Sequence, residues 1–157
     1  MLYLTFRQGE NDFGLDSRRI VEVVPHVAVR AIPHAPDYFL GLLSYRGLVV
    51  PVVDFGRLIG SPAARPALNT RVVIVRTDTE GRADRRLGLL AENVDRVVAG
   101  DRVSTVLPAM SLAEAPYLGK VIKHGERLVQ LIRTEFLLPG VVHEALFGEP
   151  DGAEAGR

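Results

Sequence analysis

The chain has no cysteine and no tryptophan among its 157 residues. Without cysteine it can form no disulfide bond, offers no thiolate nucleophile and cannot build a zinc site of the zinc-finger type. Its 19 basic and 19 acidic residues cancel, so no overall field attracts nucleic acid or an anionic membrane. These absences leave the apolar pattern as the main source of information.

Long hydrophobic runs are also missing. The longest, residues 48–53, is interrupted by Pro51 and is far shorter than the roughly 18 residues that indicate a spanning helix. The opening residues MLYLTFR show neither the basic start nor the small-residue cleavage site of a secretory signal. We therefore expect a cytoplasmic protein.

Short apolar runs separated by turn residues predict a mainly β fold with few helices. The expected strands are residues 2–6, 12–15, 27–32, 42–45, 48–54, 71–77, 86–91, 94–98, 117–123 and 127–133. The expected helices are residues 17–23, 37–40, 54–59 and a C-terminal helix over 133–147. Residues 82–86 (RADRR) are expected at a solvated hairpin tip.

The segment GSPAARPALNT, residues 60–70, has no apolar period and predicts a connection between two halves. Subdomain one would take about residues 13–60 and subdomain two about residues 70–132, within a single domain of residues 1–148. Each half is small for a separate barrel, so we expect one cooperative unit with a shared core. Residues 149–157 lack large apolar side chains and are expected to form a disordered tail.

Motifs for chemistry are scarce. The four histidines have no metal-ligand spacing, and neither GxGxxG nor GxxxxGK[ST] occurs. Four carboxylates remain candidates for acid–base work if they converge in space, although Asp54 is better explained as the N-cap of a helix. We therefore expect no enzyme, no cofactor and no metal. The four carboxylates are Glu22, Asp54, Glu92 and Asp95.

One window is unusual. Residues 36–55, PDYFLGLLSYRGLVVPVVDF, place Arg46-Gly47 between two apolar runs. Because arginine stays charged at cellular pH, Arg46 must either pair with a carboxylate, for which Glu22 is the candidate, or project outward to meet a partner. Both interpretations remain open from the sequence.

The order of these segments resembles that of the CheW-like domains, the coupling modules of bacterial chemosensory arrays. Residues 41–54 are similar to the family signature Gly-x-x-Asn-x-Arg-Gly-x-x-x-Pro-x-x-Asp, and the resemblance extends from residue 2 to about residue 138. It implies two SH3-like five-stranded β-barrels around a shared core, no catalysis and no cofactor. It also implies two partners at membrane-associated arrays: a chemoreceptor cytoplasmic tip, held between the barrels, and the regulatory domain of a CheA-type histidine kinase.

The resemblance assigns two sets of residues. Receptor-binding residues are expected to be Ile20, Glu22, Val23, Tyr45, Arg46 and Gly47. Kinase-binding residues are expected to be Asp54, Arg57, Leu58, Asp95 and Val97.

The chain departs from the family pattern at several positions. Ser44 replaces the usual asparagine, Glu92 stands where aspartate is usual, and residues 130–133 (QLIR) lack the aspartate that typically closes the last strand. This drift resembles auxiliary coupling proteins of dedicated pathways, including the surface-sensing Wsp type. Two other functions are carried as alternatives: a barrel that binds single-stranded nucleic acid, which needs aromatic platforms and a basic groove, and a small carboxylate-based hydrolase.

Overall fold

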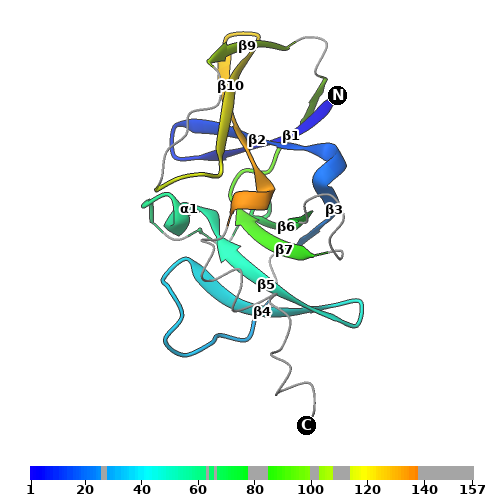
Figure 1. The fold of residues 1–157 in the computed structure, drawn as a ribbon, viewed down its shortest axis with the longest axis vertical. Coiled ribbons are helices and arrows are strands. Elements are labelled where there is room, and N and C mark those ends of the chain that lie inside the picture. The colour runs from blue at the N-terminus through cyan, green and yellow to red at the C-terminus, as the bar shows by residue number, and fades with distance from the viewer. Residues whose placement is uncertain are drawn as a thin grey trace, which may run out of the picture.

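In a computed structural model of the chain, the described strands form two sheets (Figure 1). The structure describes residues 1–25, 28–62, 64–65, 67–77, 85–99 and 114–137, and the backbone of residues 103–107. The first sheet, sheet A, has the order β8-β1-β2-β11-β10-β9, and the second, sheet B, has the order β3-β6-β7-β5-β4. The predicted mainly β fold with two subdomains is confirmed.

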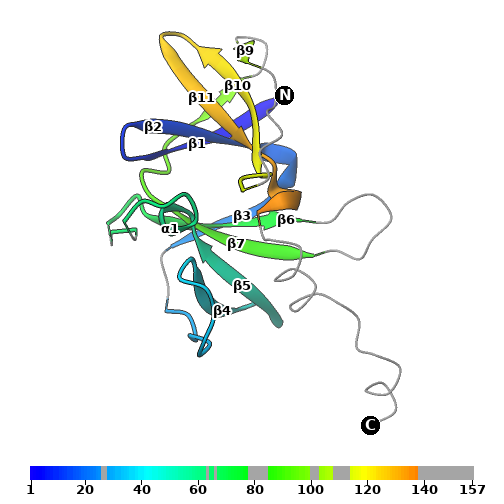
Figure 2. The same ribbon diagram turned by 60° about the vertical axis from the view of Figure 1, so that its left-hand side comes forward.

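Sheet A is assembled from both ends of the described chain (Figure 2). The β1–β2 hairpin joins the β10–β11 hairpin through a parallel pairing of β2 with β11. The strands of sheet A are β1 (Leu2–Gln8), β2 (Asn11–Asp16), β8 (Val97–Ala99), β9 (Val103–Leu107), β10 (Leu118–His124) and β11 (Arg127–Ile132).

Sheet B uses a continuous middle stretch of the chain. Its strands are β3 (Ile20–Pro25), β4 (Phe39–Tyr45), β5 (Leu48–Asp54), β6 (Arg71–Arg76) and β7 (Arg86–Ala91). The helices are short: η1 (Ser17–Arg19) between β2 and β3, α1 (Phe55–Leu58) after β5, and η3 (Thr134–Phe136) after β11.

A shared core joins the two sheets, as the sequence predicted. β6 and β7 are buried on both faces, which explains their continuous apolar sequences VVIV and LGLLA. One face packs against sheet A and the other lines the interior of sheet B. Phe55 of α1 lies at the centre, with ring centroids 5.0 Å from Phe6 and 4.7 Å from Phe13.

Several predictions of local structure were wrong. Residues 17–23 were expected to be helical, but only η1 is, and β3 begins at Ile20, because its β-branched residues pair with β6. No helical turn forms at residues 37–40, where a turn leads into β4. Of the strand expected at 27–32, the described part forms a single bridge between Arg30 and Leu42. β9 was not predicted.

The sheets also divide the chain differently from the predicted boundaries of 13–60 and 70–132. Sheet B runs from β3 to β7 across the proposed connection, while sheet A takes β1 and β2 together with β8 to β11. The cause is the parallel pairing of β2 with β11, a contact between distant segments. Most of the predicted C-terminal helix, the tail and most of the RADRR tip lie outside the described residues.

Candidate functional site

The hairpin between β4 and β5 carries the arginine singled out by the sequence. Tyr45 pairs with Leu48, so the turn consists of Arg46 and Gly47 alone. Both have positive φ, 49° for Arg46 and 79° for Gly47, which is the type I′ geometry that matches the twist of a hairpin. A bulky residue is rare in this region, so the turn holds Arg46 in a defined position at the tip.

Arg46 pairs within the chain. Its Nη2 lies 2.6 Å from Glu22 Oε1 on β3, and the Tyr45 hydroxyl donates to the same oxygen at 3.0 Å. The Arg46 guanidinium also lies 5.5 Å from the centroid of the Tyr45 ring. These contacts link the two edge strands of sheet B through side chains. The internal ion pair with Glu22 is therefore present, although the Arg46 side chain stays 70% exposed.

The Tyr45 ring is buried while its hydroxyl meets the Glu22 carboxylate. Burial, followed by the hydrogen bond to Glu22, raises the pKa of Tyr45 above the usual value near 10. The hydroxyl therefore remains a proton donor at cellular pH and helps to fix Glu22.

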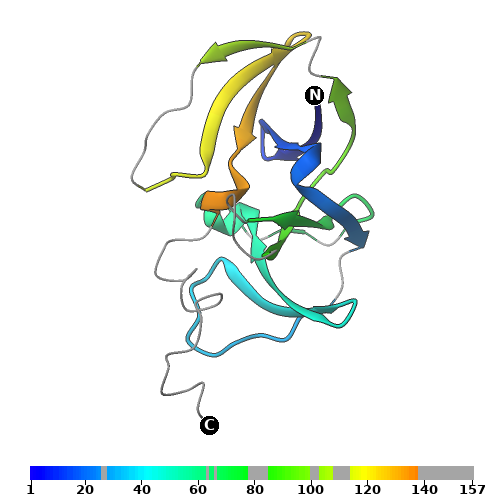
Figure 3. The ribbon, with the colours of Figure 1, turned by 45° about the vertical axis from the view of Figure 1, so that its right-hand side comes forward.

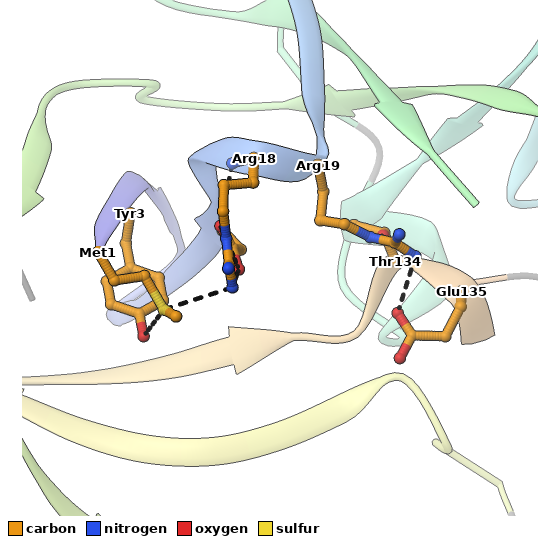
Figure 4. A network of polar contacts seen from close by, with 7 residues as sticks. Met1, Tyr3, Arg18, Arg19, Thr134 and Glu135 are labelled. Carbon is orange, nitrogen blue, oxygen red and sulfur yellow. Dashed lines mark hydrogen bonds and ion pairs between the residues drawn. The ribbon is translucent and has the colours of Figure 1, made fainter. Parts of the chain in front are cut away.

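A second polar network fixes the passage from sheet A to sheet B at η1 (Figure 4). The Asp16 side chain caps η1 by accepting from the Arg18 backbone N–H at 2.9 Å, and the Arg18 guanidinium lies 2.8 Å from its other oxygen. The hydrogen bonds from Arg18 hold the pKa of Asp16 below its ordinary value. Arg18 also lies 3.9 Å from the sulfur of Met1.

The neighbouring Arg19 ties η1 to η3. Its Nε donates to Thr134 Oγ1 at 3.1 Å, and its Nη2 lies 3.4 Å from Glu135 (Figure 4). Thr134 in turn donates to the Arg76 carbonyl at the end of β6. The segment after β2 and the segment after β11 are therefore joined through Thr134, directly before β3 starts.

Partly exposed apolar side chains lie on the core-facing sides of β1, β8 and β3. On β1, Leu2 lies on the same face as Leu4, which packs in the shared core. Val97 of β8 pairs with Leu4 and has the same orientation. Leu2 is 49% and Val97 53% exposed, so sheet A presents apolar surface at this edge.

In sheet B the side chains on the core-facing side come from β3, the blue arrow that follows η1 in Figure 3. Ile20 pairs with Val75, and Val23 pairs with Val73, both of which face the shared core. Ile20 is half-buried against that core and Val23 is 37% exposed. We use the name β3-side groove for this set of four apolar residues, Leu2, Ile20, Val23 and Val97, which lie on the core-facing sides of their strands.

The predicted receptor residues therefore separate into two groups. Ile20 and Val23 belong to the β3-side groove. Glu22 pairs with Ile74 on the opposite face, where it meets Tyr45 and Arg46 at the hairpin tip. Leu2 was missed by the sequence analysis, because its exposure depends on how the two sheets pack.

The predicted kinase residues come from two segments, the end of β5 with α1 and the segment at β8. Asp54 is 1% exposed and caps α1, accepting from the backbone N–H groups of Arg57 and Ala64, so it cannot touch a partner directly. This confirms the N-cap interpretation. Arg57 is exposed beside Asp37, and Leu58 is partly buried.

The other two kinase candidates lie far along the chain from α1. Asp95 is exposed and pairs with Arg96 at 3.0 Å. Val97 belongs to the β3-side groove. Their role in binding a kinase stays a prediction.

A second cleft opens between α1 and sheet A, with a volume of about 680 Å³. Phe13 lies at its base, Leu58 and Ile59 come from α1 and its C-terminal end, and Tyr117 and Val121 come from the approach to β10 and from β10 itself. None of the predicted receptor residues lines it. No local pattern in the sequence predicts this cleft, because its walls come from segments distant in the chain.

The arrangement offers little for acid–base chemistry. Of the four candidate carboxylates, Asp54 caps a helix, Glu92 accepts from the Arg65 backbone N–H, and Asp95 and Glu22 pair with arginines. No group of three potential metal ligands occurs within the described ranges. Phe6, Phe13 and Phe55 are buried, so they cannot act as stacking platforms for bases.

Comparison with known proteins gives a consistent result. The family model for the CheW-like domain matches residues 2–141. The chain is 27% identical over 146 residues to a chemotaxis protein CheW of Rhizobium meliloti, covering 90% of each chain. It is 23% identical over 137 residues to a chemotaxis protein CheW of Helicobacter pylori, covering 87% of this chain and 80% of the relative.

A solved structure is similar in fold. The scaffolding protein TtCheW of Thermoanaerobacter tengcongensis superposes with a TM-score of 0.72 at 22% identity, covering 96% of this chain and 91% of the other. The described residues contain no helix long and apolar enough to cross a membrane.

Proposed function

We propose that this chain, which belongs to the CheW-like domain family, is a non-catalytic scaffold that couples a chemoreceptor to a CheA-type histidine kinase. Its relatives are named chemotaxis proteins, and the similar solved chain is described as a scaffolding protein. No described residues converge as an acid–base site, which favours binding over catalysis. The expected place of action is the cytoplasmic face of receptor arrays.

The β3-side groove is the observation that carries the receptor part of this proposal. A receptor tip is a pair of antiparallel helices, and a helix docks into an apolar groove with charges at its rim. Leu2 and Val97 supply apolar surface from sheet A, and Ile20 and Val23 supply it from sheet B. Arg18, in η1 directly before β3, is exposed and supplies a charge close to Ile20 in the chain.

Arg46 would act from the opposite face of β3, at the hairpin tip beside Glu22. Only one of its five N–H groups has a hydrogen-bond partner within the described residues, Glu22. The other donors remain for a receptor carboxylate or carbonyl, and the type I′ turn limits the orientations of the side chain. In this proposal the ion pair with Glu22 positions Arg46 and does not compete with a receptor contact.

The test is a pull-down of the purified protein with a receptor cytoplasmic fragment and, separately, with the kinase regulatory domain. Val23→Asp places a negative charge among the apolar residues of the β3-side groove. Arg46→Glu reverses the sign of the charge at the β4–β5 hairpin tip. Both are expected to abolish receptor binding and leave kinase binding unchanged. Leu68→Asp, at a side chain that is 95% exposed in the connection after α1, is the matched control and should bind both partners.

Folding has to be followed in the same variants. Exposed ion pairs contribute about 1 kcal/mol or less, so Arg46→Glu should keep a cooperative thermal transition. If it loses that transition, Arg46 has a structural role only. If the unmodified chain binds neither partner, the coupling proposal is wrong.

The proposal also extends to what the signalling pathway controls. The departures at Ser44 and at residues 130–133 favour an auxiliary pathway, such as surface sensing, over flagellar control. Deleting the gene and measuring swimming and second-messenger levels separately would distinguish the two outputs.

A further inference from the structure

The face of sheet A that points away from the shared core changes from apolar to charged along its strands. Its apolar end is a separate buried cluster of Tyr3, Val98, Ile122, Val129 and Leu131. Because side chains alternate along a strand, Thr5 and Arg7 of β1 lie on the same face as Tyr3. By the same alternation, Arg127 shares the face of Val129, and His124 shares the face of Ile122.

Two hollows open at the charged end of this face. The larger has a volume of about 300 Å³, and its lining includes Arg7, Asp12 and Arg127. The smaller, of about 50 Å³, shares Asp12 and Arg127 with it and adds Arg96 and His124. We call the two together the sheet A hollow. Pockets for small molecules have volumes of roughly 300–1,000 Å³, so the sheet A hollow is at the small end of this range.

Hydrogen bonds within the chain hold the walls of the sheet A hollow. The Thr5 backbone N–H donates to the Arg96 carbonyl at 2.9 Å, and the Asp95 N–H donates to the Thr5 carbonyl at 3.0 Å. The Asn93 side chain donates to the Arg7 carbonyl at 3.3 Å. The segment before β8 is therefore fastened alongside β1, and the hollow needs no ligand to form.

Three arginines line the sheet A hollow, and each uses Nε for its contact within the chain. Arg7 Nε lies 3.8 Å and Arg127 Nε 3.4 Å from the two oxygens of Asp12. Arg96 Nε lies 3.0 Å from Asp95. Within the described residues, none of the three donates a hydrogen bond from its terminal amino groups. These terminal groups remain available to a ligand.

The charges in the sheet A hollow do not cancel. Three guanidinium groups line it, together with the carboxylates of Asp12 and Asp95. The Asp12 side chain is only 13% exposed, so its carboxylate is already enclosed by its two arginines. One further anion would complete the balance. A guanidinium group binds the paired oxygens of a carboxylate or a phosphate in a two-pronged manner.

The apolar part of the lining argues for a compact ligand. Phe6, Val98 and Val129 are buried, and Val94 is half-buried. The sheet A hollow therefore offers little apolar surface to a ligand, and recognition depends on charge and hydrogen bonds. A small molecule with a carboxylate or phosphate group fits these conditions.

We propose that the sheet A hollow binds the carboxylate or phosphate group of a small molecule through the terminal amino groups of Arg7, Arg96 and Arg127. This site lies apart from the β3-side groove and goes beyond the coupling function, on which it does not rest. It can be tested on the isolated full chain, and its failure would leave the coupling proposal untouched.

The experiment is a titration followed by nuclear magnetic resonance of the arginine Nε–H groups, at constant ionic strength. Succinate and inorganic phosphate are the two anionic probes, and uncharged succinamide and sodium chloride are the controls. At least one anionic probe should shift the signals of Arg7, Arg96 and Arg127 and saturate at millimolar concentration, while the controls should not. Whichever probe saturates identifies the ligand group as carboxylate or phosphate. If neither saturates, the proposal is wrong.

Two variants with opposite expected effects test the role of the arginines. Arg127→Gln should weaken binding about tenfold, the loss expected for one charge-assisted hydrogen bond. Asp12→Asn removes a competing carboxylate and should strengthen binding. Both variants break the same ion pair, so a purely structural effect would change the affinity in the same direction in both. That result would overturn the proposal.

A matched control separates a built site from general attraction to surface arginines. Arg30 is exposed and bridges to Leu42 on sheet B, so Arg30→Gln should bind the probes as the unmodified chain does. Added sodium chloride should weaken binding at the sheet A hollow. If the Arg30 Nε–H signal shifts at the same probe concentration as that of Arg127, the anions bind without selectivity and the proposal is wrong.

Discussion

The two sheets pair their strands in the same order and directions, but they come from different parts of the chain. In sheet B the β6–β7 hairpin joins the β4–β5 hairpin through the parallel pair β5 and β7. In sheet A the β1–β2 hairpin joins the β10–β11 hairpin through the parallel pair β2 and β11. β3 beside β6 corresponds to β8 beside β1, and the single bridge of Arg30 to Leu42 of β4 lies where β9 pairs with β10. Differences at corresponding positions therefore show what each sheet has specialised for.

Three positions illustrate this. After β5, Asp54 caps α1 with its side chain, whereas after β11 the cap of η3 is Arg133, which makes no such hydrogen bond. Both β4 and β10 contain an irregular register with a glycine, Gly41 and Gly119. The hairpin turns also differ: Arg46-Gly47 joins β4 to β5 and reaches Glu22 on β3, whereas the turn between β10 and β11 is Gly125-Glu126. In sheet B, side chains therefore join the two edge strands.

The largest expected effect tests whether the sheets are one folding unit. Phe55→Ala removes the ring between Phe6 and Phe13 in the shared core and should cost about 3–5 kcal/mol. Urea unfolding followed by tyrosine fluorescence and by circular dichroism should give one coincident transition at a lower midpoint. Two separate transitions would show that the sheets unfold independently. Val49→Ala, at an exposed side chain, should change stability by less than about 0.5 kcal/mol.

The second prediction compares the two glycines. Gly41 has φ 145°, and an added Cβ would lie 2.1 Å from the Arg30 carbonyl oxygen. Gly41→Ala should therefore cost at least about 3 kcal/mol through backbone strain and displacement of the Arg30 segment. A Cβ at Gly119 would lie 3.1 Å from the Leu131 oxygen, so Gly119→Ala should cost about 1 kcal/mol. Equal losses in denaturant titrations would contradict the proposed difference between the two strands.

The third prediction concerns the caps. Asp54→Ala removes the acceptor for two backbone N–H groups and should cost about 2 kcal/mol. Arg133→Asp supplies sheet A with the missing cap and should stabilise the protein by about 0.5–1 kcal/mol. Differential scanning calorimetry would measure both. A fall in stability for Arg133→Asp would mean that the contact of Arg133 with the Phe136 ring, at 4.4 Å, outweighs the new cap.

The smallest effect is the pH dependence of the sheet B hairpin. Burial and the bond to Glu22 raise the pKa of Tyr45, so the folded state keeps the phenol proton where the unfolded chain loses it. This contribution is complete below the ordinary tyrosine pKa near 10 and is lost as pH rises through the higher folded value. Tyr45→Phe should therefore flatten the alkaline fall in stability. The urea midpoint at pH 8 and pH 11 measures the change, and an unchanged slope would contradict it.

Local features of the sequence predicted much of this arrangement. The alternation of apolar runs gave the strands β4 to β7, and Asp54 before Phe-Gly-Arg-Leu gave the cap. The candidate pairing of Arg46 with Glu22 was also right. The strands and the cap depend on residues close together in the chain. The ion pair follows from the charge of Arg46, which needs either a carboxylate or an outward position.

Other features depend on contacts between distant segments. The sequence of β3, Ile-Val-Glu-Val-Val, fits a helical spacing as well as a strand, and its pairing with β6 decides the outcome. The division of the chain into sheets follows from β2 meeting β11. The exposure of Leu2 depends on how the sheets pack, and Arg7 and Arg127 meet at Asp12 because β2 pairs with β11, so neither could be deduced from spacing.

The split origin of sheet A has a consequence for synthesis on the ribosome. Sheet B is complete once β7 has emerged, and its five strands can pair while the rest of the chain is still being made. The β1–β2 hairpin emerges first but must wait for β11, since Asp12 pairs with Val129, and chain elongation at about 5–20 residues per second makes this a delay of several seconds. During that time the finished sheet B and Phe55 can bury Phe6 and Phe13. The β1–β2 hairpin can therefore dock on sheet B before the rest of sheet A exists.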